Sequence, residues 1–171
     1  QLNVWAEGYF CPVLQDGYLV GMQIRMRNPK KQKYIWLSSS GKRAGISSGA
    51  PVCFYGDPDA ESVIITAGIL KAYVTYCLLS DIGVSVIGVP GVNVLGGLKE
   101  LLKQHHHKIA YEAYDMDKLE NEYVASAAEK VQQIAHAAGL QSTSLVWNTA
   151  YKGIDDWQLA LRQEEVKENA A

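Results

Sequence analysis

The spacing of hydrophobic positions changes along the chain and divides it into two parts. Up to residue 59 the apolar stretches are short and are separated by turn residues, among them Asp16-Gly17. An Asp-Gly pair between two apolar runs is typical of a β-hairpin. A further apolar run at 33–37 and a loop rich in Ser and Gly at 38–49 follow it. We therefore expect a small antiparallel β lobe over residues 1–59.

From residue 60 onward, continuous apolar runs alternate with segments of helical periodicity. The alternation predicts four strands, at 62–66, 84–89, 108–114 and 142–147, and three helices, at 69–79, 94–104 and 120–138. Apolar strands that alternate with helices are typical of a parallel sheet covered on both faces. The sequence thus predicts an α/β domain over residues 60–171, with a parallel sheet of about four strands and flanking helices.

Composition and charge place the chain among ordinary folded proteins. Of its 171 residues 48% are hydrophobic and 20% are charged, and the net charge is −2. Without a general basic field, any contact with nucleic acid has to be local. Three widely spaced cysteines and no C-x-x-C pair indicate reduced thiols in a cytoplasmic protein. The chain has no apolar run of 18 residues and no signal peptide, so we expect no membrane partner. Because residue 1 is Gln rather than Met, we expect a segment of a longer protein.

Two aspartates, Asp115 and Asp117, follow the third predicted strand. In open parallel sheets, ligands bind at the carboxyl ends of the strands. Proteins usually hold Mg²⁺ with one or two carboxylates, and water and substrate phosphates complete the coordination. The pair therefore predicts metal-assisted phosphoryl or nucleotidyl chemistry with Mg²⁺, or with Mn²⁺ in its place. The alternative is a pair of solvated loop acids, because Asp-x-Asp is a common sequence.

Further candidates follow the neighbouring strands. Lys71, one turn into the first predicted helix, is either a phosphate ligand near the helix N-terminus or a surface lysine. The glycines of 88–93 either bring backbone N–H groups to a phosphate or form a tight turn with a positive φ at Gly91. After the fourth strand, we assign Asp155 to the metal site and Asp156 to a helix N-cap.

Two other clusters have competing interpretations. Consecutive histidines do not face one cation, so we expect residues 105–107 in a surface loop at the sheet end opposite the carboxylates. The basic residues of the β lobe are interleaved with Tyr34 and Trp36. They either follow a single DNA strand through phosphate attraction and base stacking or form a solvated edge. They are Lys30, Lys31, Lys33, Lys42 and Arg43.

These stretches, taken in order, resemble one protein family. The matching segments are 8–10, 21–25, 33–34, Trp36 and 47–51 in the β lobe, and 63–72, 86–92, 115–117, Asn121, Val124, Trp147 and 152–156 in the α/β part. Over nearly its whole length the chain resembles the TOPRIM-like domain of uncharacterised function in proteins of phages, plasmids and integrative elements. Such domains are often joined to primase or helicase modules.

The resemblance implies a sheet of the kind found in bacterial primases, topoisomerases and some nucleases. In such domains an Asp-x-Asp pair binds Mg²⁺, and a glutamate after the first strand acts as a general acid or base. The family pattern Thr-Glu-Gly reads Thr66-Ala67-Gly68 here. Alanine neither binds metal nor transfers a proton, so we expect this copy to be inactive. Either Ala67 is an engineered change, or it is a natural loss in a copy kept for binding.

The resemblance therefore implies a primase-like, Mg²⁺-dependent nucleotidyl transfer domain in the DNA replication of a mobile element. The catalytic positions it implies are Ala67, where Glu is expected, with Lys71, Asp115 and Asp117; Asp155 joins the two acids at the metal. Nucleic acid or phosphate is expected to bind at Lys71, Arg25, Lys33, Lys152 and Asn121. The expected partners are a single-stranded DNA template, nucleotides and a helicase module. The alternatives are a metal-dependent nuclease and a non-catalytic module that binds nucleotide or nucleic acid.

Overall fold

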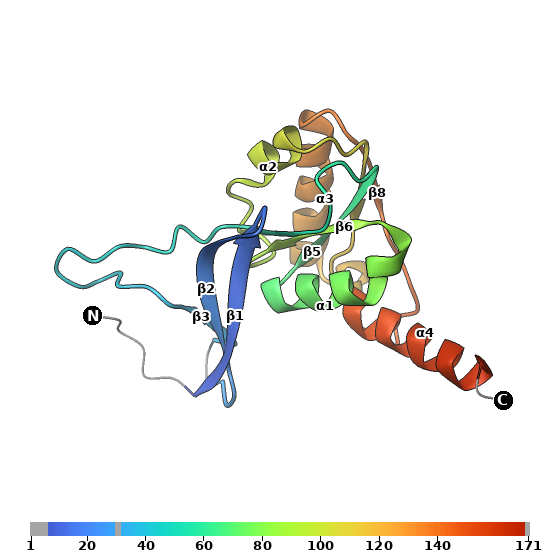
Figure 1. Cartoon of the computed structure of the whole chain (residues 1–171), viewed down its shortest axis with the longest axis horizontal. Helices are drawn as coiled ribbons and strands as arrows, with labels where there is room; N and C mark the ends of the chain where they lie inside the picture. Colours follow the sequence, from blue (N-terminus) through green and yellow to red (C-terminus); the bar gives the residue numbers. More distant parts are fainter. Residues whose placement is uncertain (1–6, 30–31, 170–171) are drawn as a thin grey trace.

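A computed structural model describes residues 7–29 and 32–169, and it shows an α/β body with a small antiparallel sheet beside it (Figure 1). The sheet of the body has five strands in the order β4-β6-β5-β7-β8. The strands β4 to β8 are Cys53–Tyr55, Ser62–Ala67, Ser85–Val89, Ile109–Glu112 and Gln141–Ser144. Strands β5 to β8 run parallel, and they are the four strands that the hydrophobic pattern predicts. The predicted fold class is confirmed.

The fifth strand, β4, is an addition that the sequence pattern did not predict. It pairs antiparallel with β6 at the edge of the sheet, and its three residues are all buried. Three residues are too few to display a hydrophobic period, so the segment resembles the loop that precedes it. Because β4 lies before residue 60, the first part of the chain contributes an edge strand to the body.

The small sheet consists of β1 (Gly8–Gln15), β2 (Tyr18–Met26) and β3 (Tyr34–Trp36), in that order. Strands β1 and β2 form the predicted hairpin, with φ of 48° at Asp16 and 79° at Gly17. Two successive positive φ angles match the right-handed twist of the strands, which is why Asp-Gly suits this turn. The loop that follows β3 projects away from the body before the chain enters β4 (Figure 1).

Helices cover both faces of the sheet of the body. They are α1 (Ile69–Leu79), α2 (Leu98–Gln104), α3 (Glu122–Ala137) and α4 (Ile154–Asn169), with short 3-10 turns η1 (Ser80–Ile82) and η2 (Met116–Leu119). Helix α2 begins at residue 98, later than predicted, because Gly97 adopts a left-handed φ of 79° that interrupts the helix. Gly91 forms the predicted turn, in which Val94 N donates to Gly91 O at 2.8 Å, but its φ is not positive. Within the described residues, no helix is both long and apolar enough to cross a membrane.

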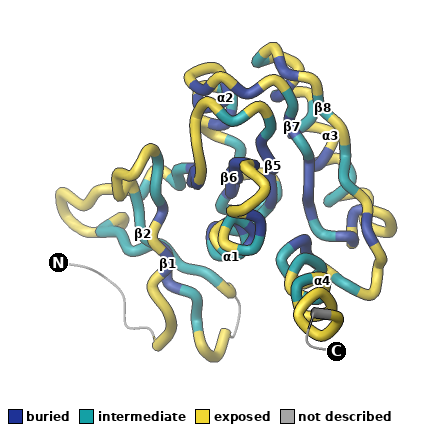
Figure 2. Tube along the Cα trace, turned by 45° about the vertical axis from the view of Figure 1, so that its right-hand side comes forward, coloured by how far each residue is buried: buried dark blue, intermediate teal, exposed yellow. Residues whose placement is uncertain are grey.

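Two hydrophobic clusters, one on each face, stabilise the sheet. Alternate residues of β5 point to opposite faces, so Val63 and Ile65 pack with α2 and α3, whereas Ile64 packs with α1 and the N-terminal strands. Figure 2 shows the buried centre of the body along β5 and β6. Gly88 of β6 permits this packing, because a Cβ there would lie 2.6 Å from both Ala72 Cβ and Cys53 Sγ.

The expectation of a surface loop at the three histidines is wrong for two of them. His105 and His107 are buried, whereas 78% of the His106 side chain is exposed. His107 Nδ1 donates to Ala60 O at 2.6 Å, and His105 Nε2 lies 3.1 Å from Asp16 Oδ1 in the hairpin turn. The segment is extended as it enters β7, so its alternate side chains point inward and the one between them points outward.

Candidate functional site

The candidate site lies at the carboxyl edge of two neighbouring parallel strands. Strand β5 ends at Ala67, and Gly68, with φ of 113°, turns the chain into α1. On the adjacent strand, Ala113 N donates to Ile65 O at 2.8 Å, and Thr66 Oγ1 donates to Ala113 O at 2.9 Å. Because these strands run parallel, the loop after β7 leaves the sheet at the same edge as Ala67.

That loop carries both predicted metal ligands, and each is paired with a lysine. Lys71 Nζ donates to Asp115 Oδ1, and both side chains are mostly buried, with 17% and 23% of their surfaces exposed. Lys152 Nζ donates to Asp117 Oδ2 in a more exposed pair, and this hydrogen bond raises the pKa of Lys152. A backbone hydrogen bond also joins the loop after β7 to the loop that precedes α4, because Met116 N donates to Lys152 O at 2.9 Å.

Asp155, in the first turn of α4, lies close to the same Lys71 side chain. Its Oδ1 atom is buried and has no hydrogen-bond partner among the described residues. Burial raises the pKa of Asp155, whereas the nearby Lys71 charge lowers it. Gly153 permits this approach, because a Cβ at that position would clash with Asp155 Oδ1 and lie 3.0 Å from Lys71 Nζ. Lys71 therefore faces two carboxylates, those of Asp115 and Asp155.

A buried ion pair fixes the ends of the loop that carries Asp115 and Asp117. Glu112 is the last residue of β7 and Lys118 lies in η2, and their charged atoms are 2.8 Å apart in the protein interior. Lys118 Nζ also donates to Ser144 Oγ at 2.8 Å and to Leu145 O at 2.7 Å. Glu112 Oε1 accepts from Tyr114 N at 2.5 Å, so both partners are fully hydrogen-bonded. We call this pair the Glu112–Lys118 clasp.

Sequence reasoning missed the clasp, although a signal for it exists. Glu112 is a single acid within an apolar strand, and such a position is buried only when a partner compensates its charge. Lys118 follows six residues later, past the two aspartates, and supplies that charge. The clasp therefore ties the last residue of β7 to η2, the turn that contains Asp117.

The β lobe brings one predicted binding residue toward the acids. The Arg25 guanidinium lies 5.1 Å from the centre of the Tyr34 ring, and its Nη1 atom is buried without a partner in the described part of the chain. Burial raises the pKa of the Tyr34 phenol, Arg25 lowers it, and the Asp155 charge raises it further. The phenol is therefore within electrostatic reach of both Arg25, in β2 of the small sheet, and Asp155, in helix α4 of the body.

The other predicted binding residues are placed elsewhere or have other partners. Lys33 is exposed at the start of β3, and Asn121 is the N-cap of α3, where its Oδ1 accepts from Tyr123 N at 3.0 Å. Trp36 is half-buried and packs against the hydrophobic core. Lys42 and Arg43 are exposed on the long loop, and Lys30 and Lys31 lie outside the described residues. Asp156 Oδ2 accepts from Gly153 N at 3.4 Å, at the start of α4.

The donor set fits a hard divalent cation only if other ligands complete the coordination. Asp115 and Asp117 supply carboxylate oxygens at one edge, and the Asp155 oxygen is buried nearby without a partner among the described residues. Within 7–29 and 32–169, no three His, Cys, Asp or Glu side chains form a ready metal cluster. Mg²⁺ characteristically takes one or two carboxylates, with water and phosphate as its remaining ligands. The residues therefore fit an ion that is delivered together with a phosphate.

Comparison with known proteins identifies the fold. No protein-family model and no curated protein matches the chain. It is similar to a chain in a bacteriophage T7 complex of the lagging-strand DNA polymerase with primase domains of two gp4 subunits bound to an RNA/DNA hybrid and dTTP. The TM-score is 0.54 and the identity 16%, and the match covers 94% of this chain and 74% of that one.

It is also similar to the primase fragment of the bacteriophage T7 primase-helicase protein. Here the TM-score is 0.54 and the identity 14%, over 93% of this chain and 60% of that fragment. The chain thus spans about three fifths of the fragment. Likeness at such low identity shows a fold rather than an activity, and the fold of this chain is primase-like.

Proposed function

We propose that this domain is of the TOPRIM type and belongs to a protein that transfers nucleotides with Mg²⁺ during the DNA replication of a mobile element. One observation carries the proposal: Ala67, the Lys71–Asp115 pair and the Lys152–Asp117 pair converge on one sheet edge of a primase-like fold. Acids and lysines at one edge supply both a place for a divalent cation and counter-charges for phosphates.

The roles of the residues follow from their charges and contacts. Asp115 and Asp117 would hold the cation, with Asp155 beside them as a third oxygen donor. Mg²⁺ there would offset the negative charge of a nucleotide triphosphate and help to align it for attack. With the acids engaged by the cation, Lys71 and Lys152 would be free to bind phosphate oxygens. Position 67 is where a general acid or base belongs, so the chain with alanine there binds nucleotide without turning it over.

The partners proposed for the protein follow from the same chemistry. The T7 primase domains similar in fold to this chain are described with an RNA/DNA hybrid and dTTP, and the T7 fragment comes from a primase-helicase protein. We propose that the present domain acts on a single-stranded DNA template with nucleotides and works beside a helicase module.

A second candidate function is a non-catalytic module that binds nucleotide or nucleic acid. The observation that favours it is the pairing of each acid with a lysine, since these pairs are complete without a metal. A nuclease is the third outcome, because the same acids on the same fold also suit hydrolysis. Primer synthesis from ribonucleotides supports the primase proposal, and a shortened template supports the nuclease. Binding without either reaction, even with glutamate restored at position 67, supports the module.

We expect Mg²⁺ to stabilise the chain through Asp115 and Asp117. An ion that binds only the folded state raises stability by RT ln(1 + [L]/Kd), about 2.7 kcal/mol at a hundredfold excess over Kd. Thermal melts with and without millimolar Mg²⁺ should differ for the unchanged chain and coincide for Asp115→Asn. Asp59→Asn, a change at an exposed acid far from the site, is the control and should keep the shift. An equal shift in Asp115→Asn would remove these acids from the metal site.

A further inference from the structure

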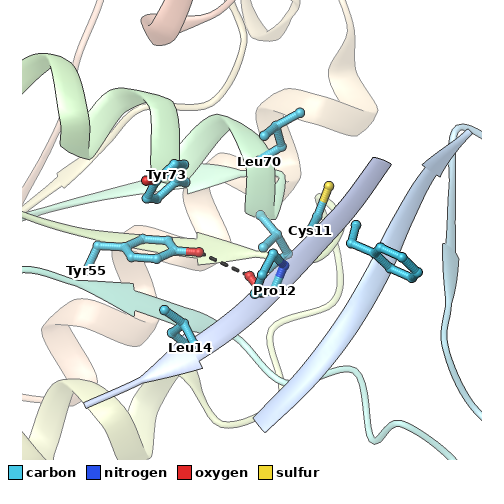
Figure 3. Close-up of a pocket in the computed structure, with 8 residues that line it drawn as sticks. Cys11, Pro12, Leu14, Tyr55, Leu70 and Tyr73 are labelled. Atoms are coloured by element: carbon cyan, nitrogen blue, oxygen red, sulfur yellow. Dashed lines mark hydrogen bonds between the residues drawn. The ribbon is translucent and has the colours of Figure 1, made fainter. Parts of the chain in front are cut away.

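A cavity of about 340 Å³ lies between β1 and the first turns of α1 (Figure 3). Its labelled walls are Cys11, Pro12, Leu14, Tyr55, Leu70 and Tyr73. The Tyr55 and Tyr73 rings meet edge to face with centroids 5.4 Å apart, and Tyr55 Oη donates to Pro12 O at 3.2 Å. The hydrogen bond fixes one ring, while Tyr73 remains half-exposed at 49%.

The size and walls of this cavity suit a flat, largely apolar ring. Small-molecule sites in proteins occupy about 300–1,000 Å³ and are lined mainly by hydrophobic and aromatic side chains. Aromatic side chains stack on any nucleobase, because every base has a π face. The partly exposed Tyr73 ring therefore offers a stacking surface, with Leu70 and Pro12 as apolar walls around it.

The cavity is adjacent to the candidate site for phosphate. Leu70 lines the cavity and Lys71, the next residue of α1, pairs with Asp115, so the two sites flank one helix about 10–12 Å wide. Arg25 of β2 pairs with Tyr9 of β1, two residues before Cys11 in the cavity wall. Burial raises the pKa of the Cys11 thiol, and the nearby Arg25 lowers it. The buried Arg25 Nη1 has no partner among the described residues.

We propose that this cavity binds a nucleobase, with the phosphates of the same nucleotide directed toward Arg25 and Lys71. The proposal rests on the proposed function and adds to it the site that holds the base. An apolar side chain of a protein partner would also fill the cavity, but it would leave the buried Arg25 Nη1 without a ligand. A nucleotide suits both the apolar cavity and the neighbouring Arg25, since it carries a flat ring at one end and negative charge at the other.

Isothermal titration of the full chain in Mg²⁺ tests this inference. The ligands are ATP, inorganic tripolyphosphate and a single-stranded dT oligomer. Tyr73→Ala removes the stacking ring, and Leu70→Trp fills the cavity, so the test does not depend on one variant. Tyr18→Ala, which removes an aromatic side chain that is 75% exposed outside the cavity, is the matched control. Thermal melts verify that each variant folds.

We expect both cavity variants to weaken ATP binding about 10-fold or more, the size of a lost base stack, while tripolyphosphate binding and the Tyr18→Ala control are unchanged. If both cavity variants weaken binding of the dT oligomer alone, the result also supports a base site in the cavity, and the base then comes from a DNA strand. ATP and oligomer binding that is unaffected by both variants, or tripolyphosphate that binds as tightly as ATP, overturns the base site and leaves the phosphate site intact. Failure of the unchanged chain to bind any of the three overturns the proposed function together with the base site.

Discussion

Asp155 differs from an ordinary surface acid, because it is half-buried and its buried Oδ1 atom lacks a partner among the described residues. Such an arrangement costs stability, and uncompensated groups of this kind are characteristic of functional sites. A sequence indicates that an acid stands near a strand end, but it does not indicate whether the carboxylate is hydrogen-bonded. The position of Asp155 beside Lys71 depends on Gly153, whose missing Cβ leaves room for both.

We expect Asp155→Asn to stabilise the chain at neutral pH. Burial raises the pKa of Asp155 above its ordinary value of 3.8, so the folded state resists ionisation more than the unfolded state does. The free-energy cost of ionising Asp155 in the folded state is absent below pH 3.8. It develops as the pH rises from 3.8 through the raised pKa, and it is complete above that pKa. Thermal melts at pH 7 should show an increase of roughly 2–4 °C, which corresponds to about 1 kcal/mol in a chain of this size. The increase should vanish near pH 3.5. A variant less stable than the parent at pH 7 would contradict this account.

At the scale of elements, the hydrophobic pattern predicted most of the body. Strands β5 and β6 were predicted to within a residue, because continuous apolar runs bounded by Gly are clear signals. The start of α2 was missed, since a left-handed glycine ends helical geometry without changing the apolar spacing. The Glu112–Lys118 clasp was missed for a different reason. Its partners come from a strand and a 3-10 turn, and only the folded loop brings them together.

We expect Lys118→Met to destabilise the chain by about 3–5 kcal/mol, because it leaves Glu112 charged and unpaired in the interior. Urea unfolding measures the loss. Replacing both partners, with Glu112→Met added, should recover part of it, since no buried charge is then left uncompensated. The matched control is Lys108→Met, which breaks an exposed pair with Glu61 at 3.5 Å and should cost no more than about 1 kcal/mol. Equal losses in the two lysine variants would show that the clasp does not stabilise the loop.

At the scale of the whole molecule, the β lobe and the body form the candidate site together. Arg25 and Tyr34 come from the small sheet and Asp155 comes from the last helix, yet both Arg25 and Asp155 are close enough to shift the pKa of the Tyr34 phenol. The resemblance of ordered motifs predicted that both parts belong to one unit, but not which side chains meet between them. The contacts between these side chains depend on how the β lobe packs against α1. The hydrophobic pattern of either part alone carries no information about that packing.

The central claim is that position 67 lies beside a metal and nucleotide site from which only the catalytic carboxylate is missing. The most direct measurement is ribonucleotide incorporation on a single-stranded template in Mg²⁺, made side by side for the unchanged chain, Ala67→Glu and Ala67→Gln. We expect incorporation with Ala67→Glu alone, above the background by about the 10²–10⁴-fold that general acid or base catalysis typically contributes. Gln has the same size without the ionisable group, and adding Asp117→Ala to Ala67→Glu should abolish the gain. No incorporation by Ala67→Glu, in a chain that binds Mg²⁺ and nucleotide normally, would contradict the claim.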